Sequence, residues 1–227
     1  MTMRHSSGIQ KLALAGLIAT SALVVVAAMV LGIRLLTMHR NQASVPPTTD
    51  AVGGFPMNGN LAPDFNLVDQ FGHSVTLSSM RGREVVLAFI DSRCKTLCPL
   101  TAEIMYNAKK QLGSSTASQV VLVAINANPV ANSVAAVQSW SINHGMLHQW
   151  LFLTGTAQQL QSVYHQYGLY DQVTSDGQVT HDPAMYIIDA SGRERLFFET
   201  FDSNTASDLS SEEIGLEAGM RQWLPQP

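Results

Sequence analysis

The sequence predicts a layered α/β domain preceded by one membrane-spanning helix. Apolar runs typical of buried strands alternate with helical segments along most of the chain, which is the pattern of a layered α/β domain. The chain finishes on a strand hairpin followed by a helix. Near its start, Leu12–Ile33 carries no charged residue, and as a helix this segment would span roughly 33 Å, enough to cross a bilayer.

The chain ahead of the domain divides into three segments. Residues 1–11 are a short tail, residues 12–33 the transmembrane anchor, and residues 34–60 a flexible linker with several prolines and glycines. No clean small-residue cleavage site follows the apolar segment, which favours an uncleaved anchor over a cleaved signal peptide. A short tail ahead of a first apolar helix usually stays inside. We therefore expect a single-pass membrane protein whose domain, residues 61–227, faces the extracytoplasmic (periplasmic or outer) side.

The composition narrows the classes of partner. Charged residues make up 13% of the chain, and the formal net charge is −4. The charges of the domain are mainly acidic, which argues against a nucleic-acid partner. The two cysteines, Cys94 and Cys98, indicate a pair that works together in an exported domain.

The first half of the domain is expected to hold a hairpin, two central strands and a helix between them. Ala62–Leu77 is typical of two short strands around a glycine turn. Glu84–Ile90 is dense in apolar residues, as in a buried central strand, and Gln119–Ile125 is a second such strand. Pro99–Leu112 is predicted to be a helix because proline suits a first helical turn and Gly113 ends the segment.

The second half continues the alternation and closes with the hairpin and helix. Thr156 is a plausible cap for the helix that follows it. The expected elements are a helix at Val130–His144, a strand at Gln149–Thr154, a helix at Thr156–Tyr167, a hairpin of Ala184–Gly192 with Arg193–Phe201, and a helix at Ser207–Trp223. This order matches a thioredoxin-like fold with an N-terminal β-hairpin extension and one inserted helix–strand unit.

The cysteine pair stands where a strand would deliver it to the start of a helix. Cys94 and Cys98 are four residues apart, and a proline follows at once. Backbone N–H groups and the positive end of the helix dipole stabilise a thiolate there, and Arg93 and Lys95 add positive charge. Two thiolates so close can form a disulfide or hold a soft metal ion.

At these residues the chain resembles the Sco/SenC family, membrane-tethered thioredoxin-like proteins involved in assembling the copper site of cytochrome oxidase. The resemblance covers the whole domain and is carried mainly by Cys94-x-x-x-Cys98-Pro and by His181 at a fixed offset from Gly192. It implies that a copper ion is bound by Cys94, Cys98 and His181. The ligand types agree, because thiolates favour Cu(I) and imidazole suits both Cu(I) and Cu(II).

The leading hypothesis is a membrane-anchored copper-binding accessory protein that delivers copper to an oxidase subunit or prepares its cysteines. The alternative is a thiol–disulfide oxidoreductase acting on another exported thiol protein, with Cys94 and Cys98 as its redox pair. Pro183 favours the alternative, because it stands where thioredoxins of the cytochrome-maturation type have their cis-proline. If thiol exchange operates, a cis peptide is expected at Asp182–Pro183. A peroxiredoxin-like peroxidase is a third hypothesis, but Lys95 stands where that family has threonine.

Plain structural roles remain open for the same residues. The cysteines could form a structural disulfide, although so short a loop gains little entropy, and structural zinc usually needs four ligands. His181 taken alone would be an ordinary histidine, and Asp91 is expected as a polar residue at a strand end. Met105 and Trp150 are expected in the core. The remaining histidines singled out are expected to face solvent: His73, His144, His148 and His165.

Overall fold

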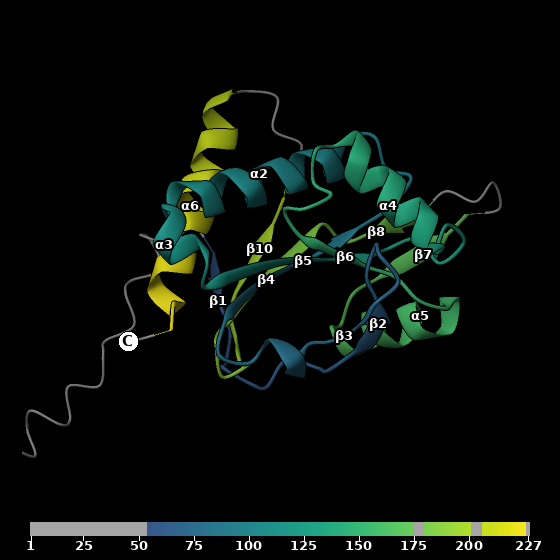
Figure 1. Cartoon of the computed structure of the whole chain (residues 1–227), viewed down its shortest axis with the longest axis horizontal. Helices are drawn as coiled ribbons and strands as arrows, with labels where there is room; N and C mark the ends of the chain where they lie inside the picture. Colours follow the sequence, from purple (N-terminus) through teal and green to yellow (C-terminus); the bar gives the residue numbers. More distant parts are fainter. Residues whose placement is uncertain (1–53, 175–178, 201–205, 226–227) are drawn as a thin grey trace, which may run out of the picture. The chain divides into compact units, whose positions relative to one another are not determined.

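The computed structural model describes residues 54–174, 179–200 and 206–225 (Figure 1). The predicted tail and transmembrane anchor, together with the linker as far as residue 53, lie outside these residues. Within the part of the chain that is described, no helix has the length and apolar character needed to cross a membrane.

A six-stranded mixed sheet forms the centre of the domain, in the order β1-β10-β9-β4-β5-β6. Three of its strands run parallel: β4 (Glu84–Ile90), β5 (Val120–Asn126) and β6 (Leu151–Leu153). Three more complete it in antiparallel pairs: β9 (Ala184–Ile188), β10 (Glu194–Glu199) and β1 (Phe55–Pro56).

The central strand β4 is buried along its whole length, and alternate side chains face opposite layers. From Val86 on, its even-numbered residues pack in a hydrophobic cluster with α2 (Leu97–Gln111), α4 (Val134–Asn143) and α6 (Ala206–Trp223). Its odd-numbered residues pack in a second cluster on the other face, with α5 (Ala157–Gln166) and an N-terminal hairpin. Figure 1 shows the helices of the first cluster on one side of the sheet and α5 on the other.

Two small sheets and two short helical turns complete the described structure. The N-terminal hairpin pairs β2 (Asn66–Val68) with β3 (Ser74–Thr76) and turns at Gly72, whose φ is 86°. This positive φ is easily adopted by glycine. The other elements are the hairpin of β7 (Asp171–Val173) with β8 (Val179–His181), the helix α3 (Ser114–Ala117) and a 3₁₀ turn at Ser78–Met80.

The main predicted strands and helices are present, with differences at their ends. The helix predicted from Val130 starts at Val134, because Ser133 caps it by accepting the N–H of Ala136 on its Oγ at 3.1 Å. Thr156 caps α5 as predicted, in a reciprocal arrangement with Gln159.

Short strands appear where the sequence predicts linker or loop. The linker was expected to reach residue 60, but Phe55 and Pro56 already pair with β10, and Met57 N–H donates to Arg195 O at 2.9 Å. The β7–β8 hairpin occupies part of the segment between the predicted helix ending at Tyr167 and the predicted hairpin starting at Ala184, for which no strand was predicted. Strands of two or three residues are too short to show the alternation of apolar and polar residues by which strands are predicted.

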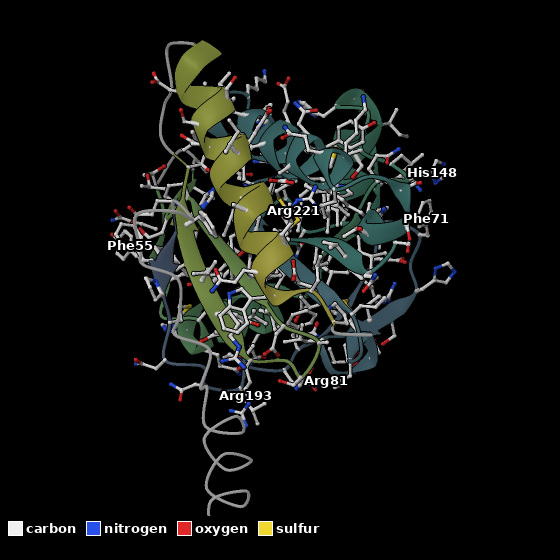
Figure 2. The ribbon with its side chains drawn as sticks, turned by 90° about the vertical axis from the view of Figure 1, so that its left-hand side faces the viewer. Phe55, Phe71, Arg81, His148, Arg193 and Arg221 are labelled. Atoms are coloured by element: carbon white, nitrogen blue, oxygen red, sulfur yellow. The ribbon has the colours of Figure 1, made fainter. Side chains whose placement is uncertain are left out.

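Both edges of the sheet are short, and Phe55 and Phe71 lie at its opposite sides (Figure 2). On the β6 side, Gln70 supplies hydrogen bonds that another strand would otherwise make. Its amide N–H groups donate to the carbonyls of Leu147 and Trp150, both at 2.9 Å, and its Oε1 accepts the N–H of Phe152 at 2.8 Å. Gln70 therefore covers the outer side of this edge strand.

Candidate functional site

The cysteines lie in the loop that joins the carboxyl end of β4 to α2, and Asp91 shapes this loop. One oxygen of the buried Asp91 side chain accepts the N–H of Arg93 at 2.7 Å and the side-chain N–H of Asn128 at 2.9 Å. The backbone carbonyl of Asp91 accepts the N–H of Cys94 at 3.0 Å. Asp91 is thus a polar residue that builds the turn at the strand end.

Two buried asparagines at the carboxyl end of β5, its last residue Asn126 and the following Asn128, hold the loop from the neighbouring strand. Asn126 Oδ1 accepts the N–H of Ser92 at 3.3 Å, and its Nδ2 donates to the carbonyl of Ala131 at 2.9 Å. Asn128 Oδ1 accepts the N–H groups of Val130 and Ala131 at 3.0 and 2.9 Å. No role was predicted for these two asparagines. The sequence feature that could have indicated their role is a polar side chain at the carboxyl end of a strand parallel to β4. The carboxyl ends of parallel strands lie at the same edge of a sheet, so such a side chain lies near the loop after β4.

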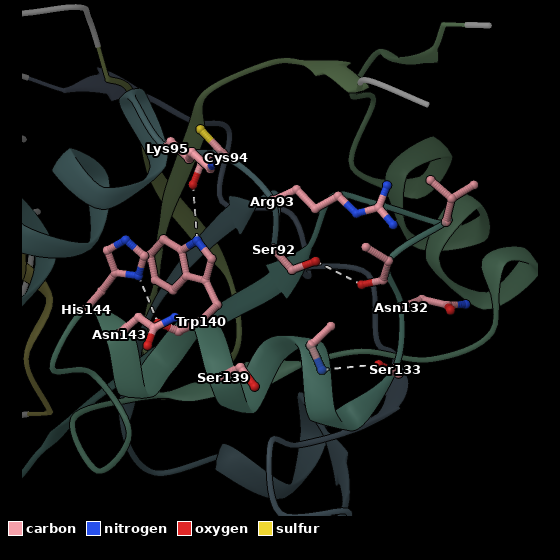
Figure 3. A pocket seen from close by; sticks show the side chains of 13 residues that line it. Ser92, Arg93, Cys94, Lys95, Asn132, Ser133, Ser139, Trp140, Asn143 and His144 are labelled. Carbon is pink, nitrogen blue, oxygen red and sulfur yellow. Dashed lines mark hydrogen bonds between the residues drawn. The ribbon is translucent and has the colours of Figure 1, made fainter. Parts of the chain in front are cut away.

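Trp140 on α4 fixes the loop from the other side. Its indole N–H donates to the carbonyl of Cys94 at 3.3 Å, and its ring stacks on His144 with centroids 3.9 Å apart (Figure 3). Trp150, predicted in the core, is buried and packs on Trp140 at 5.5 Å. The backbone that carries Cys94 is therefore held by β5 and by α4.

The three residues proposed as ligands come together in one pocket of about 220 Å³. Cys98 Sγ lies 3.8 Å from Nε2 of His181, and the N–H of Cys98 donates to Cys94 Sγ at 3.4 Å. Both cysteines are free thiols. Among the described residues, no three His, Cys, Asp or Glu side chains are arranged to hold a metal ion together. The three residues line a common space without forming a complete coordination shell.

The two thiols differ in acidity. The hydrogen bond from Cys98 lowers the pKa of Cys94 to about 5, although burial opposes this, and the N–H of Cys98 adds to the effect. The same thiol–thiol hydrogen bond, and then burial, raise the pKa of Cys98. At neutral pH Cys94 is therefore the thiolate and Cys98 keeps its proton. A half-buried thiolate is both a nucleophile and a ligand for a soft metal ion.

His181 presents the nitrogen that a metal ligand needs. Its Nδ1 lies 2.9 Å from the carbonyl of Asp182, and since a carbonyl only accepts, this hydrogen bond requires the proton on Nδ1. The lone pair of Nε2 then faces Cys98. A backbone carbonyl that fixes the tautomer in this way is the usual second partner of a metal-bound histidine.

Pro183 also lines this pocket, but the prediction of a cis peptide bond before it is wrong. None of the described peptide bonds is cis, including the bond between Asp182 and Pro183. X–Pro bonds favour trans by about 0.5–1 kcal/mol unless the fold imposes otherwise. Here the Asp182 carbonyl accepts hydrogen bonds from His181 Nδ1 and from the N–H of Ala184, both at 2.9 Å. Pro183 thus borders the thiols without the backbone geometry that the thioredoxin resemblance implied.

The other residues singled out lie as expected. Met105 is fully buried in the cluster that α2 shares with β4. Four of the histidines are exposed: His73, His144, His148 and His165.

Comparisons with known proteins identify a family and several relatives of this chain. A family model described as SCO1/SenC matches residues 56–214. The SCO1 protein homolog of Bacillus subtilis is 23% identical over 164 residues, which cover 69% of this chain and 82% of that protein. The crystal structure of Arabidopsis thaliana ScoI with copper bound has a TM-score of 0.61 at 25% identity, over 72% of this chain and 100% of that one.

A second solved structure is also similar to this chain. It is that of BsSco, a member of the Sco family of cytochrome c oxidase assembly proteins in which a disulfide switch was identified. The TM-score is 0.56 at 21% identity, over 70% of this chain and 96% of that one. The mixed α/β sheet of this chain is therefore similar to that of solved Sco structures.

Proposed function

The chain belongs to the SCO1/SenC family, and from this premise we propose that it binds copper and assists assembly of the copper site of cytochrome oxidase. The ligands are Cys94, Cys98 and His181. The observation that carries the proposal is the common pocket of these residues, with Cys98 Sγ 3.8 Å from His181 Nε2. Copper-bound ScoI of Arabidopsis thaliana supports the choice of metal by similarity.

The chemistry of the pocket residues fits copper better than other metals. The pKa of Cys94, lowered to about 5, provides a thiolate at neutral pH, and the tautomer of His181 leaves Nε2 free. Cys98 has to lose its proton to become a ligand, because metal binding releases protons from thiols. Two sulfurs and one imidazole favour Cu(I), and bound copper would be the cargo passed to the recipient. With three protein ligands, the shell remains accessible to a donor atom of the recipient.

We further propose that the domain is tethered to a membrane and works on its extracytoplasmic side. The support comes from the sequence, in which Leu12–Ile33 is uncharged and long enough to span a bilayer. A copper-receiving oxidase subunit on the same side would then be within reach of the tethered domain.

Copper analysis of the purified full-length chain tests the proposal. After reduction, copper loading and dialysis, we expect close to one copper per wild-type chain and almost none in the double variant Cys94→Ser/Cys98→Ser. His181→Ala should bind copper more weakly than wild type in a competition titration. His165→Ala is the matched control, because His165 is exposed on α5 and does not line the pocket. Equal copper content in wild type and the cysteine double variant would refute the site.

Thiol–disulfide exchange is the second candidate function, and the acidity of Cys94 favours it. The Cys94 thiolate would attack a disulfide of an exported protein, form a mixed disulfide and release one thiolate of that protein. Cys98, once deprotonated, would attack Cys94 Sγ, which leaves the Cys94–Cys98 disulfide and the second target thiolate. His181→Ala separates the two functions, because exchange with a model disulfide should persist in this variant while copper affinity falls. Exchange that is negligible in wild type would eliminate this candidate.

A further inference from the structure

A second and larger pocket lies on the other side of Cys94. It measures about 740 Å³ and is lined by the loop that follows β4, by residues 130–133 and by one side of α4 along its length (Figure 3). Neither Cys98 nor His181 lines it, so it is distinct from the pocket of the proposed copper ligands. Cys94 lines both pockets. A group held in the larger pocket would therefore lie beside one of the proposed ligands.

The charge in this pocket is of one sign. Arg93 and Lys95 line it and are both exposed, and no aspartate or glutamate is among the lining residues. Within the described residues, neither cation takes part in an ion pair. Figure 3 shows the side chain of Arg93 extending across the pocket toward Asn132. On a chain with a formal net charge of −4, this is a local excess of positive charge without an internal partner.

Hydrogen bonds between the surrounding segments hold the walls of this pocket in place. Ser92 Oγ donates to the carbonyl of Ala131 at 2.8 Å, which ties the Cys94 loop to the start of the α4 segment. Trp140 closes the floor through its hydrogen bond to the Cys94 carbonyl. Ser139 lies exposed on α4 at the pocket wall, and Val130 adds an apolar rim that is 53% exposed. A polar, cationic pocket with an apolar rim suits a short peptide segment that carries carboxylates.

We infer that this pocket docks an acidic segment of the protein that receives the copper, next to Cys94. The identity of the partner rests on the proposed function, whereas the acidic character of its docking segment rests on the charges of the pocket. Docking there leaves the opposite side of Cys94, where Cys98 and His181 lie, open to the recipient's metal-binding side chains.

Fluorescence anisotropy with the copper-free, reduced full-length chain tests the inference. The probe is a short fluorescent peptide rich in Asp and Glu and without cysteine, compared with the same peptide carrying Lys at the acidic positions. We expect the acidic peptide to bind more tightly than the lysine peptide and to lose affinity at high salt, because the attraction between exposed charges is screened. Equal binding of the two peptides would overturn the inference.

Removal of the two cations should weaken binding of the acidic peptide. For Arg93→Gln/Lys95→Gln we expect a loss of about three- to tenfold, since exposed ion pairs contribute modestly. The matched control is Lys110→Gln/Arg193→Gln, which removes the same charge from two exposed residues that do not line the pocket. An equal loss of affinity in the control would show unspecific attraction and would overturn the docking site.

A variant that fills the pocket provides a second test without a change of charge. Ser139→Phe places a bulky ring on the pocket wall, whereas Ala135→Phe places it at an exposed position of the same helix outside the pocket. Only Ser139→Phe should weaken peptide binding, and an effect of equal size in both would overturn the inference. Because the assay contains no copper and no peptide thiol, its result is independent of the copper analysis. Copper binding with no peptide binding would refute the docking site alone, and the reverse result would refute the copper-receiving partner alone.

Discussion

The two ends of β4 place acidic groups in opposite surroundings. Beyond the carboxyl end, hydrogen-bond donors around Cys94 lower its pKa to about 5. At the amino end, Glu84 is fully buried, and neither oxygen of its carboxyl group has a hydrogen-bond partner among the described residues. Burial, and then repulsion from Asp189, raise the pKa of Glu84 to about 9.

The difference shows that burial alone does not decide which groups are ionised. Burial raises the pKa at both places, but only the loop after β4 provides donors strong enough to reverse its effect. A single strand therefore connects a thiolate available for chemistry with a carboxylic acid that is neutral at pH 7. The polar framework of Asp91, Asn126 and Asn128 is present at one end only.

The largest expected effect concerns the donor to Cys94. Cys98→Ala removes the thiol that contributes most to the acidity of Cys94, so its pKa should rise toward the ordinary value of about 8.5. At pH 6 the rate of alkylation of Cys94 should then fall by roughly a hundredfold, because only the thiolate reacts. Alkylation rates measured by mass spectrometry between pH 4 and pH 9 would show it. An unchanged pH profile would show that the hydrogen bond from Cys98 does not lower the pKa of Cys94.

The next effect, on stability, is expected from Glu84→Gln at the amino end of β4. A carboxyl group whose pKa rises from 4.5 to about 9 on folding costs no stability below pH 4.5, and the cost grows until pH 9. Replacement by glutamine should therefore leave stability unchanged at pH 4 and increase it by up to about 3 kcal/mol at pH 7. Urea unfolding at the two pH values measures the difference.

Glu103→Gln is the control for this experiment, because Glu103 is an exposed carboxylate on α2. The free energy of unfolding of the Glu103→Gln variant should stay within about 0.5 kcal/mol of the wild-type value at both pH values. If Glu84→Gln gives the same change at pH 4 and pH 7, the carboxyl group of Glu84 is not the source of a pH-dependent cost.

The smallest effect concerns the framework of the cysteine loop. Asn128→Ala removes the hydrogen bond to Asp91 and the acceptor of two backbone N–H groups, which should cost about 2 kcal/mol of stability. Asn128→Ala should lower the stability of the domain, whereas Glu84→Gln should raise it at pH 7. The reason is that Asn128→Ala removes hydrogen-bond partners at the carboxyl end of β4, where they are present. Urea unfolding of Asn128→Ala beside Asn143→Ala, an exposed position, provides the comparison. Equal midpoints would show that the framework adds no stability.

The parts of the fold predicted from the sequence are those with a repeating pattern. β4 was predicted with its observed bounds because all seven residues lie in a dense apolar run, and the Thr156 cap was visible as a polar residue before a helical segment. β1 was missed because its pairing partner, β10, lies far along the chain, whereas β7 and β8 were missed although they pair with each other locally. Short strands of this kind carry too few residues for a periodic signal.

The candidate ligands were found by their motif, whereas the residues that orient them were not. Cys94, Cys98 and His181 were identified from spacing and resemblance, and the structure brings them into one pocket. Asn128 and Trp140 act through hydrogen bonds to residues 37 and 46 positions away, so no local pattern marks them. The cis-proline expectation failed because a shared position in a motif does not determine a peptide-bond isomer.

The short edges of the central sheet bear on how copies of this protein behave at high local concentration. Exposed strand edges invite pairing with a neighbouring molecule, which leads to aggregation. Here β1 has only two residues, and Pro56 has no N–H to offer a further strand. On the opposite side Gln70 already satisfies the outward N–H of Phe152. Many molecules gathered on one surface would therefore find, in the part of the sheet that the structure describes, no long open strand through which to join their sheets.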